Sequence, residues 1–92
     1  MSKFKGVITH IGEVIELGNY KKVMVHVQEN EGEYLQSCNF EVFGEQKVDN
    51  VLKYNQVGDL VEVDYNLKSN ESKKEQGVFY NTIQAWKIQK CA

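Results

Sequence analysis

Apolar and polar residues alternate along much of the chain with a period of two, which predicts β-strands. The clearest case is residues 22–28, where Val23, Val25 and Val27 alternate with longer or polar side chains. A second alternation runs over residues 61–67. Alternation of this kind sends one set of side chains into a core and the other toward solvent. Both segments are therefore expected to be half-buried strands.

Two further segments have strand patterns with irregularities. Residues 4–17 are rich in apolar side chains that do not alternate strictly, and Gly6 and Gly12 interrupt them. Glycine inside a strand often marks a bulge or a bend, so we expect one long, bent first strand. Residues 35–43 predict a third strand, on which Phe43 lies on the face opposite to its buried neighbours.

A short helix is predicted after the third strand. Over residues 45–54, Val48, Val51 and Leu52 recur at spacings of three and four, which is the period of an apolar helix face. The later run of residues 69–77 is wholly polar. It is expected to be an exposed, mobile loop.

Residues 78–89 predict a fifth strand, in which a local irregularity near Trp86 returns Ile88 to the core. Three strands, one helix and two strands in about 90 residues is the element order of the oligonucleotide/oligosaccharide-binding (OB) fold. The curved first strand of that fold lets the sheet close on itself. We therefore expect an all-β class, a five-stranded OB-fold barrel with one short helix between strands 3 and 4, as a single domain over residues 1–92.

Composition narrows the function classes. The 92 residues are 41% hydrophobic and 26% charged, which is ordinary for a folded domain. No apolar run approaches the ~20 residues of a membrane span, and the N-terminal residues do not form a signal-peptide core, so a cytoplasmic location and no membrane partner are expected. Cys38 and Cys91 are expected to be two reduced thiols. The net charge is −2, with 11 lysines, no arginine and 13 acidic residues, so no long-range positive field attracts nucleic acid.

Two stretches carry a family resemblance. Residues 39–44, Asn-Phe-Glu-Val-Phe-Gly, and residues 54–63, with their Val-Gly-Asp turn and Val-x-Val strand, resemble the middle of bacterial single-stranded DNA-binding proteins. The closing run of residues 80–88 is similar to small bacterial and phage proteins thought to carry the same barrel. The resemblance implies the OB fold and binding of single-stranded DNA.

Flat aromatic side chains are the first candidates for a binding site, because unpaired bases stack on them. Phe43 matches the phenylalanine that stacks a base in the resembling family, although it could equally cover the barrel end. Trp86, the only tryptophan, lies among polar residues beside Lys87, which suits a stacking platform or a half-buried structural side chain equally. Tyr34 and Tyr80 flank the two polar loops predicted over residues 29–33 and 69–77.

Gly18-Asn19 predicts a tight turn after the first strand. Lysines near this first turn and near the later polar loop are the candidates for phosphate contacts. Three acidic residues oppose this interpretation. Glu41, Glu62 and Asp64 are predicted at outward strand positions, and they would repel phosphate if they line the same groove as the lysines. The candidate lysines are Lys21, Lys22, Lys68, Lys73, Lys74 and Lys87.

Signals of catalysis are weak. His10 and His26 are isolated, no phosphate-binding loop precedes the helix, and no spacing indicates a metal or cofactor site. We therefore expect a protein that is not an enzyme and has no cofactor. The predicted function is largely sequence-independent binding of single-stranded DNA, with RNA also possible, in bacterial or phage replication, recombination or repair. The predicted assembly is a homo-oligomer, either a dimer or a tetramer. The alternative is an OB-fold module for protein interaction or assembly that does not bind nucleic acid.

Overall fold

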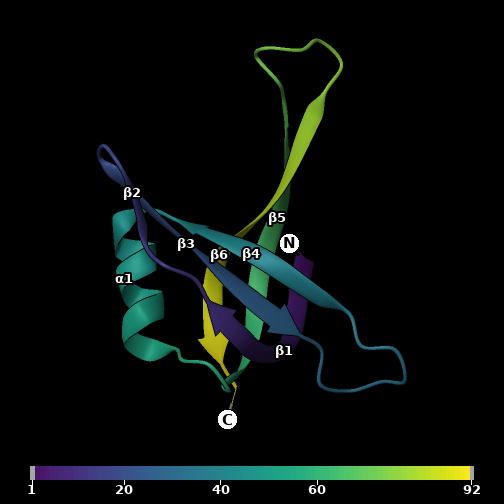
Figure 1. Ribbon diagram of the computed structural model, residues 1–92. Helices are drawn as coiled ribbons and strands as arrows, with labels where there is room; N and C mark the ends of the chain where they lie inside the picture. Colours follow the sequence, from purple (N-terminus) through teal and green to yellow (C-terminus); the bar gives the residue numbers. More distant parts are fainter. Residues whose placement is uncertain (1, 92) are drawn as a thin grey trace.

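One β-sheet and one helix make up the part of the chain that the structure describes. The computed structural model describes residues 2–91, and Figure 1 shows the arrangement of the elements. In chain order they are β1 (Ser2–Ile11), β2 (Ile15–Leu17), β3 (Tyr20–Gln28), β4 (Ser37–Phe43), α1 (Glu45–Tyr54), β5 (Leu60–Glu71) and β6 (Phe79–Lys90).

The sheet closes into a barrel through β1. The strand order is β1-β5-β6-β4-β3-β2, and β1 pairs with β3 in addition to β5. Residues Ser2 to Val7 pair with β5, whereas Val7 to Ile11 pair with β3. The short β2 follows β1 after a break and, among the described residues, pairs with β3 alone. When β1 and β2 are counted as one bent strand, the barrel has five strands and the helix lies between the third and fourth, so the predicted OB fold is confirmed.

The bend of the first strand depends on Gly6. Gly6 is buried, and a Cβ atom placed on it would lie 2.3 Å from the backbone oxygen of Gln28. The backbones of β1 and the end of β3 therefore approach more closely than any side chain allows. A register shift between Ile8 and His10 adds a bulge on the same strand. The bent, bulged first strand predicted from the sequence is thus present.

The barrel is filled by β-branched side chains around one aromatic ring. Phe40 is fully buried, and its ring lies 5.5 Å from those of Phe4 and of Tyr65. Cys38, on the same strand, packs against this core, and burial raises the pKa of its thiol. The remaining buried apolar residues are Ile8, Val23, Val25, Val27, Val42, Val48, Val51, Val61, Val63 and Ala85.

The helix has the predicted bounds, Glu45–Tyr54. Val48 and Val51 are buried as expected, but Leu52 is 45% exposed, and its predicted place on the apolar face is wrong. One residue corresponds to about a quarter of a helical turn, so Leu52 is rotated away from the barrel that Val51 contacts. Within residues 2–91, no helix has the length and apolar character needed to cross a membrane.

A long hairpin of β5 and β6 projects from the barrel (Figure 1). The predicted mobile loop over residues 69–77 is wrong in part, because β5 continues to Glu71 and pairs with β6 as far as Phe79. Polar residues form these strands because the two backbones satisfy each other's hydrogen bonds, so no buried face is required. This projecting part, residues 68–82, is called the arm below.

A bulge in β6 lies at Trp86. Tyr65 is opposite Ala85, but Asp64 is opposite Lys87, so Trp86 is the extra residue. After the bulge, Ile88 packs against the core. The irregularity predicted at this place is confirmed.

Candidate functional site

The outward side chains of β3, β4 and β6 form one continuous surface, called the outer face here. Across it, Lys22 is opposite Phe43, and Glu41 is opposite Gln84 on the parallel strand β6. Val42 is the partner of Ala85, so the residues that follow them, Phe43 and Trp86, come next on the two neighbouring strands.

Partly exposed aromatic rings gather at this end of the outer face. Phe43 is 38% exposed and Trp86 39%, whereas Phe40 and Val42 are buried, so the predicted division of β4 into two faces is confirmed. The Tyr20 ring lies 5.2 Å from the Phe43 ring, with an angle of 35° between their planes. Tyr20 is not among the residues chosen for the predicted site, although its position beside Lys21 and Lys22 at a tight turn is visible in the sequence. Tyr20, Phe43 and Trp86 are called the aromatic patch below.

Two of the predicted lysines at the first turn point in different directions. Lys22 alternates with the buried valines of β3 and therefore lies on the outer face, opposite Phe43. The Lys21 ammonium instead lies 3.8 Å from the Glu45 carboxylate and 3.7 Å from that of Asp49, both on α1. The structure thus places Lys22 beside the aromatic patch and Lys21 against the helix.

A second group of predicted residues lies on the arm. Lys68 is opposite Thr82, and Tyr80 is opposite Asn70, so Lys68 and Tyr80 share one side of the hairpin. Gln84 lies on this same side, which therefore continues into the outer face. Lys73 and Lys74 are exposed in the turn at the tip, and Lys87 is exposed on β6 next to Trp86.

Tyr34 lies apart from both groups. It is 84% exposed in the loop between β3 and β4. That loop precedes Ser37, at the opposite end of β4 from Phe43. Six steps of roughly 3.3 Å along β4 put the loop about 20 Å from the aromatic patch.

The three predicted opposing carboxylates differ in their surroundings. Lys3 Nζ lies 3.1 Å from Glu62 Oε1 and 3.4 Å from Asp64 Oδ1. Hydrogen bonds and charge attraction from these two carboxylates raise the pKa of Lys3. Glu41 lies on the outer face itself and accepts a hydrogen bond of 3.1 Å from Gln84 Nε2. Glu41 is therefore the carboxylate that opposes phosphate most directly.

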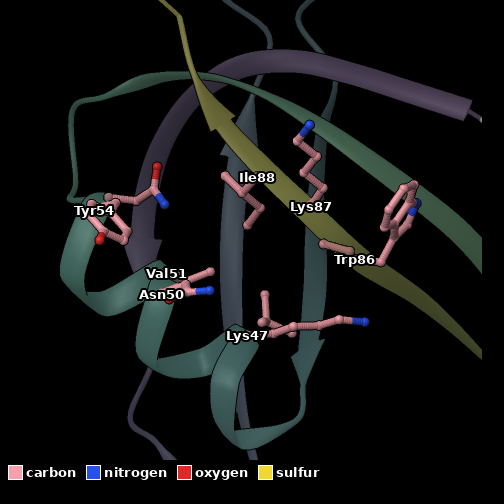
Figure 2. Close-up of a pocket in the computed structure, with 10 residues that line it drawn as sticks. Lys47, Asn50, Val51, Tyr54, Trp86, Lys87 and Ile88 are labelled. Carbon is pink, nitrogen blue, oxygen red and sulfur yellow. The ribbon is translucent and has the colours of Figure 1, made fainter.

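A pocket of about 260 Å³ lies between α1 and β6. Figure 2 shows Lys47, Asn50 and Tyr54 on the helix side and Trp86, Lys87 and Ile88 on the strand side. Its remaining lining residues are Val42, Val51, Asn55 and Ala85. Sequence reasoning missed this pocket, although residues 47, 50, 51 and 54 recur at the spacing of one helix face.

Within residues 2–91, no group of three or more His, Cys, Asp or Glu side chains is arranged to hold a metal ion. The rings of His10 and His26 nevertheless lie 6.2 Å apart on β1 and β3. They are adjacent because the two strands pair, which the sequence spacing does not reveal.

Comparison with solved structures identifies the same barrel in two other proteins. The mitochondrial single-stranded DNA binding protein Rim1 from S. cerevisiae has a TM-score of 0.51 and 22% identity, over 97% of this chain and 93% of that one. The small single-stranded DNA-binding protein from Streptomyces coelicolor has a TM-score of 0.51 and 21% identity, over 98% of this chain and 92% of that one. The fold of the chain is therefore the OB fold that these proteins have.

A family model, described as Domain of unknown function (DUF3127), matches residues 3–89. Among curated proteins, the sequence has no match.

Proposed function

The chain belongs to the family described as Domain of unknown function (DUF3127), and we propose that it binds single-stranded DNA, largely independently of sequence. The observation that carries this proposal is the aromatic patch, in which Phe43 and Trp86 are both partly exposed on neighbouring strands. Each base stacked on such a ring contributes roughly 1–3 kcal/mol. The barrel shared with two single-stranded DNA-binding proteins supports the proposal.

The position of the patch agrees with the general use of this fold. OB folds bind oligonucleotides on the face of their second and third strands, between the loop after the first strand and the loop after the fourth. Here these elements are β3 and β4, the turn at Gly18 and Asn19, and the arm. Bases would stack on the aromatic patch, and Lys22 and Lys87 would contact the phosphates beside it. The strand would continue along the side of the arm that carries Lys68 and Tyr80, toward Lys73 and Lys74 at its tip.

We further infer that the chain serves replication, recombination or repair by protecting exposed strands, and that it does so as a dimer or tetramer. Ile15 and Leu17 on β2 are 43% and 49% exposed, and β2 pairs only with β3 among residues 2–91. An apolar strand with a free edge favours pairing with another copy. Sedimentation velocity should give the mass of two or four chains, and the mass of a single chain would contradict this assembly.

Titration with oligothymidine tests the proposed binding. Trp86 is the only tryptophan, so its fluorescence reports the patch specifically. We expect quenching on addition of the oligonucleotide, with an affinity that falls as salt rises by about 0.7 logarithmic units per phosphate contact for each tenfold increase. An unchanged fluorescence together with an unchanged mobility of the oligonucleotide at low salt would rule the function out. Oligouridine in the same assay would measure any binding of RNA.

A protein-interaction module is the second candidate, favoured by the net charge of −2 and by Glu41 on the outer face. Such a module would pass through a DNA-cellulose column and bind its partner with little dependence on salt. Retention on the column at low salt, with release at high salt, would count against it.

Replacing Glu41 by glutamine should tighten DNA binding by about two- to fivefold at low salt. The variant removes a negative charge from the outer face, two residues before Phe43, while its amide oxygen can still accept the hydrogen bond from Gln84. Two unit charges 4 Å apart interact by ~1 kcal/mol in water, and salt screens this energy, so the gain should shrink at high salt. The matched control is Glu31→Gln, in the exposed loop before β4. Equal affinities of the two variants would show that Glu41 does not face the bound strand.

A further inference from the structure

We infer that the pocket between α1 and β6 receives one base of the bound strand and favours a base with an exocyclic amino group. This inference rests on the proposed binding of single-stranded DNA and adds a base-selective position to it. Adenine, cytosine and guanine carry an exocyclic amino group, whereas thymine does not.

The size and lining of the pocket fit one flat ring. Its volume of about 260 Å³ lies just below the roughly 300–1,000 Å³ of small-molecule pockets. Val42, Val51 and Ala85 are buried and supply apolar walls. Trp86 and Tyr54, which are 39% and 62% exposed, border it with aromatic rings. A planar ring with polar edges would contact both kinds of wall.

A residue that lines this pocket has a buried acceptor without a partner. Asn55 is 8% exposed, and its Oδ1 atom, which is shielded from solvent, makes no hydrogen bond with other atoms of residues 2–91. Asn55 follows the helix directly, and its backbone N–H donates to the Val51 carbonyl, so its backbone is held in place. Buried side-chain oxygens normally accept a hydrogen bond. An amino group on a base is a donor of the required kind, and it reaches this oxygen once the Asn55 side chain turns toward the pocket.

The charge of the lining favours an anionic ligand, such as a nucleotide, over a basic or purely apolar one. Lys47 and Lys87 line the pocket, and none of its lining residues is acidic, although the whole chain carries a net charge of −2. The two ammonium groups come from opposite walls, as Figure 2 shows. They are placed to contact the phosphates on the two sides of an inserted base.

Trp86 connects the pocket with the outer face. Trp86 lines the pocket. It also follows Ala85, which pairs with Val42, and Phe43 follows Val42, so Trp86 and Phe43 occupy equivalent positions on neighbouring strands. β4 and β6 are neighbouring β-strands, which lie roughly 5 Å apart. A DNA strand with one base stacked on Phe43 would therefore need to cross only this distance to place its next base beside Trp86 and α1.

A variant that fills the pocket tests the inference. Asn50→Trp adds a large side chain from an exposed helix position that lines the pocket, and Gln46→Trp adds the same side chain at an exposed position of α1 that does not. Binding of oligocytidine and oligothymidine of about 15 nucleotides, within the site sizes of OB folds, is compared by mobility shift for both variants. Both bases are pyrimidines, but thymine has a carbonyl oxygen in place of the amino group of cytosine and, in addition, a methyl group at C5.

We expect the wild-type chain and Gln46→Trp to bind oligocytidine about tenfold more tightly than oligothymidine, and Asn50→Trp to lose this difference while it still binds both. Lys47→Gln, a smaller change, should weaken the binding of both oligonucleotides by about threefold.

Equal preference in Asn50→Trp and Gln46→Trp, or no preference in the wild-type chain, would overturn the base pocket and leave the proposed function intact. Absence of wild-type binding to either oligonucleotide would overturn both. Circular dichroism of each variant verifies its fold, and if Asn50→Trp is unfolded, an unchanged affinity of Lys47→Gln overturns the pocket.

Discussion

Replacing Phe43 and Trp86 together by leucine is expected to weaken binding of oligothymidine by about thirtyfold or more. Two stacked bases contribute roughly 2–6 kcal/mol together, and every 1.4 kcal/mol corresponds to a factor of about ten. Leucine keeps apolar cover over the barrel, and both rings are more than a third exposed, so the fold should be retained. Because the variant has no tryptophan, the affinity is measured by mobility shift or with a labelled oligonucleotide.

The control for this variant is Tyr34→Leu, which removes an exposed ring at the other end of β4. Its affinity should stay within about twofold of the wild-type value, since most exposed contacts carry little binding energy. The dependence on salt should be unchanged in the double variant, because every lysine remains. A loss in Tyr34→Leu as large as in the double variant would show that the bound strand does not centre on the aromatic patch.

Changing Gly6 to alanine should lower the free energy of unfolding by about 3 kcal/mol, at the upper end of the usual cost of overpacking. The added Cβ atom would lie 2.3 Å from the Gln28 oxygen and 2.7 Å from its carbonyl carbon. Both are backbone atoms of a paired strand, so they cannot move aside as the end of a flexible side chain could. Urea denaturation followed by circular dichroism measures the change.

Gly12→Ala is the matched control, because the Cβ atom there would meet its nearest neighbour, the Met24 oxygen, at 3.5 Å. That distance is an ordinary van der Waals contact, and the variant should stay within about 0.5 kcal/mol of the wild-type chain. If the two variants are equally stable, the close approach of β1 and β3 at Gly6 does not limit the barrel.

Much of the fold was predictable from the sequence, because local patterns determine it. The alternation around Val25 is visible within a few residues, and so is the helical spacing of Val48 and Val51. The return of Ile88 to the core required a bulge in β6, and the polar context of Trp86 indicated where it lies. Strand pairs, by contrast, join residues that are far apart in the sequence, so local patterns do not predict which strands are neighbours.

The candidate site was predicted less completely, because a pattern gives the face of a strand and not the neighbours of a side chain. Phe43 was correctly assigned to the outward face, but its contact with Tyr20 depends on the pairing of β3 with β4. The acidic partners of Lys21 come from a helix more than 20 residues later. The arm was missed in part because polar composition is as compatible with a two-stranded ribbon as with a loop.

The residue at Trp86 is surplus to the pairing of β5 with β6. Ala85 points into the core, so strict alternation beyond it would turn Ile88 out to water and Lys87 into the apolar interior, and the bulge prevents this. A β6 shorter by this one residue would place Lys87 directly after Ala85 and keep Ile88 inside without any bulge. The core therefore does not need a residue at this position, and any constraint on it comes from the surface that the indole ring presents.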